Sequence, residues 1–277
     1  MQNNSLNTQD ISSDQLAEQE NCCSGTGRKD FQYFWTLEGD FIEEINRSGK
    51  DGWSGVIVAA DKISENSDSE RKICIKKQEN YFSYSSINFI RGRLTIENEA
   101  KNLKRCLDYG LTVPGIIFYG KREDSGKRQG ILVTQFLDGF TPLDKILCKG
   151  EHELRCSTKL RRGLIDKVAC EVRKLHKCKV IHNNLYPKHI FIDCETMKVA
   201  FIDFEKAKKK ISEGACQLRD LEVLSRYTPM ISRSDKLRFL KIYFGVSEFT
   251  EELRRLWRRI AKVEEKKLKR KKRHSRG

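Results

Sequence analysis

Short apolar runs and apolar–polar alternation occupy much of the first half of the chain and predict β-strands. The run 56–60 is strand-sized, and Ile73 and Ile75 alternate with polar neighbours. Two further runs, 113–120 and 130–136, flank a polar stretch and predict a hairpin. This half of the chain therefore predicts a sheet of several strands.

Residues 95–107 break this pattern and predict an amphipathic helix. Its apolar positions recur at spacings of four, three and four residues, at Ile96, Ala100, Leu103 and Leu107. Glu99 lies at the edge of this stripe, whereas Glu97 points outward. A carboxylate at the rim of a buried face can pair with a lysine on a neighbouring strand, and Lys76 is the lysine that we expect there. The alternative is an ordinary surface glutamate.

The second half of the chain predicts helices. Leu164, Val168, Val172 and Leu175 follow one face of a helix, and further helices are expected to start near residues 219 and 236. Residues 135–139 lie between the two halves. We therefore expect an α+β fold of two lobes, a β-rich N-lobe over residues 29–136 and a helical C-lobe over residues 137–262.

The positive charge is concentrated at the C-terminal end. The net charge is +15, and residues 253–277 hold thirteen lysines and arginines against two glutamates, so the rest carries only about +4. A basic end on a nearly neutral body predicts a tail, residues 263–277, that can attach to an anionic membrane surface. Nucleic acid is not an expected partner, because only Trp257 interleaves with these charges. Residues 1–28, rich in Asn, Gln and Ser, predict a disordered tail.

From the sequence we expect neither a membrane-spanning nor a secreted protein. No apolar run approaches the ~18 residues of a membrane span, and the first residues lack the basic start and apolar stretch of a secretion signal. The ten cysteines include no Cys-x-x-Cys pair, so we expect reduced thiols rather than disulfides or zinc.

Residues 180–205 have the spacing of a protein-kinase catalytic loop, which reads His-Arg-Asp-x-x-x-x-Asn and is followed by a hairpin and Asp-Phe-Gly. Here His182, Asn183 and Asn184 stand for His-Arg-Asp, His189 for Asn, and Asp203-Phe204-Glu205 for Asp-Phe-Gly. The residue expected to accept the substrate proton is thus an asparagine. A kinase-like fold is predicted, and retention of phosphate transfer stays open.

The set of nucleotide-contacting residues follows kinase order along the chain. Gly52 and Gly55 belong to a glycine-rich turn whose backbone can approach a phosphate closely, although an ordinary hairpin turn is the alternative. Lys76 stands on the next strand. Gln135 and Leu137 fall in the hinge, where a nucleotide base would bind.

Several strings in the chain resemble one bacterial family. They are Trp35-Thr-Leu-Glu-Gly-Asp-Phe, Trp53-Ser-Gly-Val, Lys76-Lys-Gln-Glu-Asn-Tyr, Tyr186-Pro-Lys-His-Ile-Phe and Asp203-Phe-Glu-Lys. They look like the InaA branch of the Kdo/WaaP lipopolysaccharide kinases, and the likeness covers about residues 31–245. The resemblance implies a cytoplasmic, ATP- and Mg²⁺-using protein that phosphorylates a sugar of the lipopolysaccharide inner core, with attachment to the inner face of the inner membrane left open.

The resemblance also assigns roles to individual residues. Lys76 would bind phosphates, Glu99 would pair with it, and Asp203 and His189 would hold the metal, while His182, Asn184 and Asp203 would form the catalytic group. Asn184 can orient a hydroxyl but cannot take its proton. Because a general base contributes typically ~10²–10⁴-fold, its loss alone would leave a slow enzyme. Two alternatives follow: Glu205 or Asp193 replaces the base, or the protein is a nucleotide-binding pseudokinase with a regulatory role.

Overall fold

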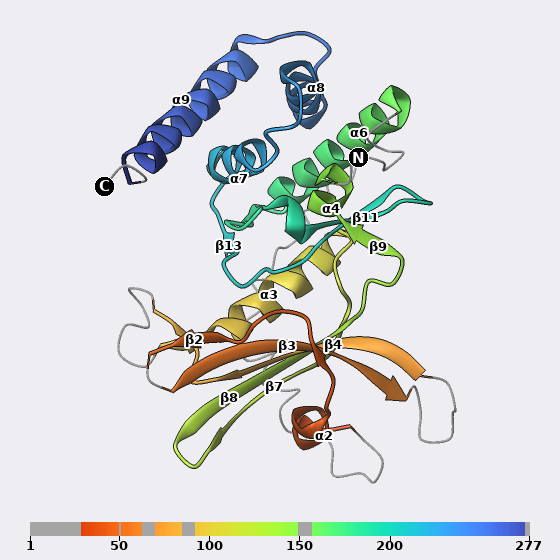
Figure 1. The fold of residues 1–277 in the computed structure, drawn as a ribbon, viewed down its shortest axis with the longest axis vertical. Coiled ribbons are helices and arrows are strands. Elements are labelled where there is room, and N and C mark those ends of the chain that lie inside the picture. The colour runs from red at the N-terminus through yellow and green to blue at the C-terminus, as the bar shows by residue number, and fades with distance from the viewer. Residues whose placement is uncertain (1–28, 50, 63–69, 85–91, 149–156, 275–277) are drawn as a thin grey trace, which may run out of the picture.

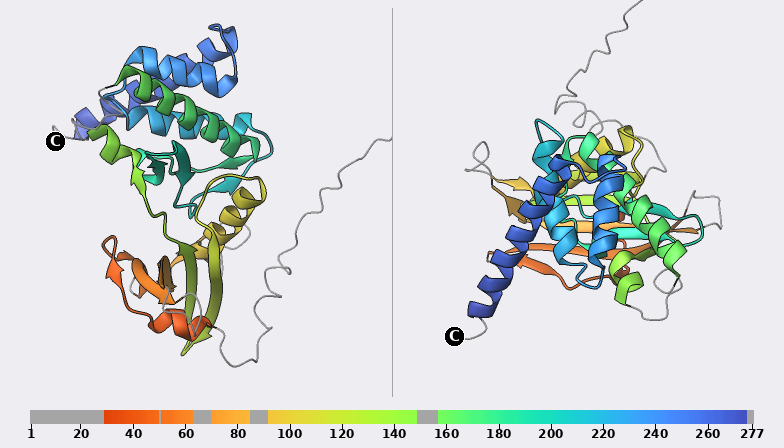
Figure 2. Two further views of the ribbon diagram at one scale, coloured as in Figure 1. Left: turned by 90° about the vertical axis from the view of Figure 1, so that its right-hand side faces the viewer. Right: turned by 90° about the horizontal axis from the view of Figure 1, so that it is seen from above.

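The computed structural model describes residues 29–49, 51–62, 70–84, 92–148 and 157–274, so the predicted disordered tail lies outside the described residues. The chain forms two lobes, as predicted, with a β-sheet in the first and helices in the second (Figure 1). Helix α3 (Thr95–Asp108) lies between them in both side views (Figures 1 and 2).

The N-lobe is built on one antiparallel sheet. Its strands run in the order β1-β3-β4-β8-β7, and β2 pairs with β3. Their bounds are β1 Asp40–Phe41, β2 Asn46–Ser48, β3 Gly52–Lys62, β4 Glu70–Glu79, β7 Ile116–Asp124 and β8 Lys127–Gln135. The predicted hairpin is present, but its strands reach much closer to the turn than the apolar runs indicated. A separate two-stranded sheet, β5 (Phe82–Ser83) with β6 (Arg93–Leu94), leads into α3.

The alternation of side chains along β4 places Lys76 on one face of the sheet and Ile73 and Ile75 on the other. Ile73 and Ile75 are fully buried in a cluster that packs against a short aromatic helix, α2 (Phe31–Thr36). Since successive side chains point to opposite faces of a strand, Lys76 faces α3 instead. Helix α2 was not predicted. Its six residues carry no apolar period, and its start is fixed by the Asp30 side chain, which accepts a hydrogen bond from the backbone N–H of Tyr33.

The C-lobe follows the hinge and begins with β9 (Phe140–Pro142). Its helices are α4 Leu143–Cys148, α6 Thr158–Lys177, α7 Gly214–Arg226, α8 Arg233–Phe244 and α9 Glu251–His274. Short strands carry the catalytic segment: β10 Val180–Ile181, β11 Ile190–Asp193, β12 Lys198–Phe201 and β13 Lys208–Lys209. One apolar core runs from α3 through these helices to α9, so the lobes share buried surface.

Two sequence expectations need adjustment. Helix α7 begins five residues before the expected residue 219, at Gly214. Helix α9 continues to His274, through most of the predicted tail, since Lys, Arg, Glu and Leu are good helix formers; it projects beyond the other helices in Figure 2. The cysteines in the described part of the chain are free thiols, as expected. No helix of the described residues is long and apolar enough to cross a membrane.

Gly52 is required by the close approach of two backbone segments. A β-carbon there would lie well inside contact distance of the Ser48 carbonyl oxygen and 2.7 Å from that of Asn80. We expect Gly52→Ala to lower the free energy of unfolding by about 2–3 kcal/mol, because backbone must shift to admit the methyl group. Gly163→Ala is the matched control: nothing lies within 4 Å of a β-carbon there, and alanine in a helix should stabilise by about 0.5–1 kcal/mol. Urea unfolding of both variants checks this, and equal stability of the two would contradict it.

Candidate active site

Lys76 is the centre of a buried ion cluster between the lobes. Its ammonium group lies 2.7 Å from Glu99 Oε2 on α3 and 2.7 Å from Glu205 Oε2, which follows Asp203-Phe204. Burial alone would lower the pKa of Lys76, but the two carboxylates raise it well above its usual value, so the lysine stays charged. The ion pair with Glu99 is the one that the helix pattern had indicated; the one with Glu205 was not foreseen.

Gln78 of β4 also attaches helix α3 to the sheet. The Gln78 amide oxygen accepts a hydrogen bond from the backbone N–H of Ile96 at 3.0 Å, and its amide nitrogen donates to Thr95 Oγ1 at 2.7 Å. These bonds satisfy a donor at the start of the helix that has no intrahelical partner. Because Gln78 and Lys76 lie on the same face of β4, this anchor fixes Glu99 opposite Lys76.

The same helix holds the segment that follows Asp203. Asn98 Nδ2 donates to the carbonyl oxygens of Glu205 at 2.6 Å and Ala207 at 2.8 Å, and Asn102 Nδ2 donates to that of Ala207 at 3.0 Å. Helix α3 thus joins the sheet of the first lobe to the segment of the second lobe that follows Asp203. Both asparagines fall outside the apolar stripe, so the sequence pattern did not distinguish them from surface residues.

Asp220 of α7 holds the loop that contains His182, Asn183 and Asn184. This fully buried carboxylate accepts hydrogen bonds from the backbone N–H groups of His182 at 2.7 Å and Asn183 at 2.8 Å, and it lies 3.2 Å from His176 Nε2. Asn183 takes a left-handed backbone conformation, with φ +61°, which this arrangement holds in place. The role of Asp220 was not predicted from the sequence. Its spacing, four residues after Cys216 and four before Leu224, places it on the buried face of α7 and could have indicated a buried carboxylate.

Asn184, Asp203 and His189 meet at the expected metal position. Asn184 Nδ2 donates to Asp203 Oδ2 at 2.5 Å, and His189 Nδ1 lies 2.8 Å from the Asn184 carbonyl oxygen, to which it must donate. Burial lowers the pKa of His189, so the ring is neutral and its Nε2 carries a lone pair. That lone pair faces Asp203 Oδ2 across 3.5 Å.

Two electron-rich atoms that face each other fit a cation between them. A carboxylate oxygen and an imidazole nitrogen suit Mn²⁺ or another transition metal at least as well as Mg²⁺, which prefers oxygen. Within the described ranges, no group of three or more His, Cys, Asp or Glu side chains could hold a metal alone. A cation at Asp203 and His189 would therefore depend on further oxygen ligands from a nucleotide or water.

His182 does not reach the open site, and this corrects the expectation that it is catalytic. The side chain is fully buried, Nε2 lies 3.0 Å from the carbonyl oxygen of Ile202, and the ring packs on Phe204 at 4.8 Å between centroids. Within the described structure, its Nδ1 atom has no hydrogen-bond partner. His182 therefore positions the strand end that carries Asp203.

The two carboxylates considered as substitute bases are both engaged elsewhere. Glu205 is bound to Lys76, and Asp193 accepts hydrogen bonds from the backbone of Glu195 and from Thr196 in the turn after β11. Neither carboxylate lies in hydrogen-bond contact with Asn184. Neither Glu205 nor Asp193 is therefore placed to act as a base at Asn184.

The remaining candidates lie on the two strands that flank β4 or in the hinge. Gly52 and Gly55 are part of β3, just after the turn that contains Gly49, and Val56 of the same strand pairs with Lys76. Gln135 ends β8, and Leu137 begins the hinge. The proposed nucleotide-contacting residues thus come from adjoining strands and the link between the lobes.

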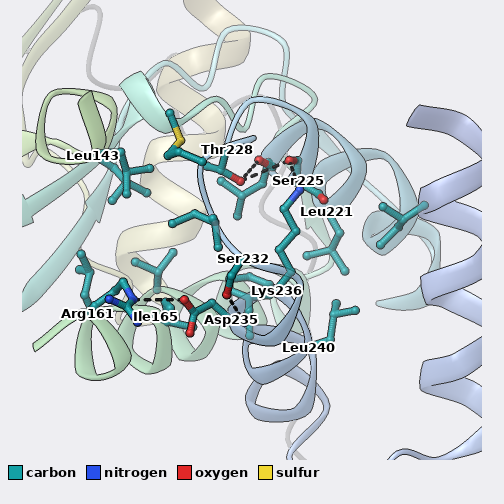
Figure 3. Close-up of a pocket in the computed structure, with 18 of the residues that line it drawn as sticks. Leu143, Arg161, Ile165, Leu221, Ser225, Thr228, Ser232, Asp235, Lys236 and Leu240 are labelled. Atoms are coloured by element: carbon teal, nitrogen blue, oxygen red, sulfur yellow. Dashed lines mark hydrogen bonds and ion pairs between the residues drawn. The ribbon is translucent and has the colours of Figure 1, made fainter. Parts of the chain in front are cut away.

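A separate apolar cavity lies in the C-lobe, between α4, α6, α7, α8 and α9 (Figure 3). It measures about 290 Å³, and none of the candidate site residues lines it. Its walls are mainly aliphatic, including Leu143, Ile165, Leu221 and Leu240. Its polar groups pair with one another: Arg161 with Asp235 at 3.1 Å, and Lys236 with the Ser225 carbonyl oxygen at 2.8 Å.

Two features together define a protein with a kinase fold. One is the sheet with helix α3 and the Lys76–Glu99 pair, and the other is the loop after β10 that Asp220 of α7 holds. The sequence model of the Lipopolysaccharide kinase (Kdo/WaaP) family matches residues 32–243, and the chain belongs to this family.

Individual relatives agree with this assignment. Protein InaA of Escherichia coli K12 is 25% identical over 219 residues, which cover 78% of this chain and 96% of that protein. Lipopolysaccharide core heptose(I) kinase WaaP of Pseudomonas aeruginosa is 24% identical over 170 residues, covering 57% of this chain and 63% of the relative. A solved structure, WaaP in complex with acyl carrier protein, matches with a TM-score of 0.63 at 21% identity, covering 87% of this chain and 93% of that chain. That last likeness confirms the fold.

Proposed function

We propose that the protein is an ATP-dependent phosphotransferase that transfers the γ-phosphate to a hydroxyl group of a lipopolysaccharide inner-core sugar. The observation that carries this proposal is the buried Lys76–Glu99 pair beside Asp203, which is the arrangement that positions phosphates in kinases. The curated WaaP relatives, which are named as heptose kinases, support the choice of a sugar acceptor. The exposed arginines of α9 (Arg254, Arg255, Arg258 and Arg259) support a position near an anionic membrane surface.

Each residue of the site has a distinct task in such a reaction. Lys76 would bind phosphate oxygens, and Asp203 and His189 would hold a divalent cation, which supplies charge neutralisation when bound. Asn184 would orient the acceptor hydroxyl through its amide oxygen. Among the residues that the structure describes, Asp203 is the one carboxylate bonded to Asn184, so the proton would leave to solvent or phosphate and transfer would be slow.

A pseudokinase is the second candidate, and the Asn184–Asp203 hydrogen bond favours it. An amide that donates to the metal-binding carboxylate stabilises this carboxylate without a cation. In a working protein kinase the position of Asn184 carries an aspartate that accepts the substrate proton, and the metal ions are held at the positions of Asp203 and His189. The protein would then bind a nucleotide and act through a partner.

Binding of Mg²⁺-ATP should raise the melting temperature, by an amount equivalent to about 2.7 kcal/mol at a hundredfold excess over Kd. Lys76→Met and Asp203→Ala should remove most of this shift. Lys77→Ala is the matched control, because Lys77 points to the opposite face of β4 and donates to the Leu37 carbonyl oxygen. Differential scanning fluorimetry measures the shift, and its absence from the wild type at millimolar nucleotide would refute a nucleotide site.

Asn184→Asp should couple stability to metal. The new carboxylate would contact Asp203, so the metal-free variant should melt below the wild type, and Mg²⁺ or Mn²⁺ should restore it. If the base is all that is missing, transfer from labelled ATP to purified lipopolysaccharide core should rise by roughly 10²–10⁴-fold. Metal-restored stability without a gain in transfer would support the pseudokinase. A variant slower than the wild type would contradict both candidates.

The C-lobe cavity supports a proposal about a partner. Native interiors rarely hold voids larger than a water molecule, and apolar cavities of about 150 Å³ are known to bind apolar ligands. The 290 Å³ space therefore has room for a flexible apolar chain. Because the structurally similar WaaP was solved with acyl carrier protein, we propose that an acyl group presented by such a carrier fills this cavity.

An acylated carrier protein should therefore raise the melting temperature, and the unacylated carrier should not. Ile165→Phe places a larger side chain in the cavity and should abolish the difference, whereas Ile211→Phe, at a position 95% exposed, should preserve it. Equal shifts with acylated and unacylated carrier, or an unchanged response in Ile165→Phe, would contradict the proposal.

A further inference from the structure

Glu205 makes a contact with Lys76 that has no counterpart in the protein-kinase pattern. Protein kinases carry glycine at this position, which has no side chain that could contact the strand lysine. Here the Glu205 carboxylate fills that space and lies 2.7 Å from Lys76 Nζ, the same distance as Glu99. The group that should bind nucleotide phosphates is thus already bound by two carboxylates.

The charge balance around Lys76 is unfavourable for an anion. Two carboxylates, those of Glu99 and Glu205, contact one ammonium group, and the carboxylate of Asp203 also interacts electrostatically with it. A lysine ammonium has three N–H donors, and the two carboxylates use two of them. A metal-free nucleoside triphosphate would therefore meet net negative charge in a site of low dielectric, where repulsion is strong.

Of the two carboxylates, that of Glu205 is the more accessible and can leave Lys76 more readily than that of Glu99. Glu99 is held by α3, which Gln78 attaches to the sheet. The backbone of Glu205 is also held, because its carbonyl oxygen accepts a hydrogen bond from Asn98. The side chain of Glu205, however, is 16% exposed against 9% for Glu99, and a change of rotamer suffices to move its carboxylate away.

We propose that Glu205 is an internal competitor for Lys76 that makes the site select metal-loaded nucleotide. The carboxylate occupies the phosphate position until a nucleotide whose charge is neutralised by a divalent cation displaces it. Metal-free ATP cannot displace it, because it would add further negative charge beside Asp203 and Glu205. This inference rests on the proposed nucleotide site and adds the residue that determines its metal dependence.

The test is the dissociation constant of ATP, measured by calorimetry in EDTA and in Mg²⁺ or Mn²⁺. The wild type should bind only with metal. Glu205→Gln, which keeps the shape and removes the charge, should bind metal-free ATP at least tenfold more tightly than the wild type. Glu195→Gln, at an exposed turn, is the matched control and should behave as the wild type. Glu205→Gly, which restores the kinase residue, should repeat the gain and serves if Glu205→Gln does not fold.

The outcomes separate this inference from the proposed function. If the wild type binds ATP equally with and without metal, or if both Glu205 variants retain the wild-type metal dependence, Glu205 is not the competitor although the nucleotide site stands. Weaker binding of metal-loaded ATP by both variants would also overturn the inference, since Glu205 would then stabilise the bound state. If neither the wild type nor any variant binds ATP, with or without metal, the protein has no nucleotide site. The proposed function and the inference about Glu205 are then both wrong.

Discussion

The buried charge of Lys76 is the constraint on which the rest of this structure depends. Moving an ammonium group out of water costs several kcal/mol, which is recovered only if opposite charges meet it in good geometry. Those charges come from two different places, Glu99 on α3 and Glu205 after Asp203. The strand, the helix and the segment of the second lobe must therefore be brought together as one unit, and Gln78, Asn98 and Asn102 supply the hydrogen bonds that do so.

The second lobe is organised around a comparable buried group. Asp220 takes up the backbone N–H groups of the catalytic loop, and His182 supports the strand end from inside. The loop therefore presents Asn184 and Asp203 in a fixed relation, although Asn184 has lost the carboxylate that a kinase uses. This ordered arrangement around Asn184 fits both a slow phosphotransferase and a nucleotide-binding pseudokinase. The two differ in whether a hydroxyl held by Asn184 still reacts.

Much of this arrangement could be predicted because it depends on local pattern. The period of α3 placed Glu99 at the rim of the buried face, although it wrongly turned Glu97 outward, which is also buried. The alternation of β4 placed Lys76 on one side of the sheet. Glu205 could not be placed, because its partner is 129 residues away and the sequence offers many lysines. His182 was misjudged for a related reason: the kinase spacing gives its position in the chain but not the direction of its ring, which packing on Phe204 decides.

The measurement that tests this account most directly is a crystal structure with a non-hydrolysable ATP analogue and Mn²⁺. The account predicts that Lys76 keeps its contact with Glu99, that phosphate oxygens replace Glu205 on the ammonium group, and that the cation lies between Asp203 and His189. A structure in which the analogue binds while Glu205 remains on Lys76, or in which Asn184 still donates to Asp203 with no cation beside it, would contradict the account.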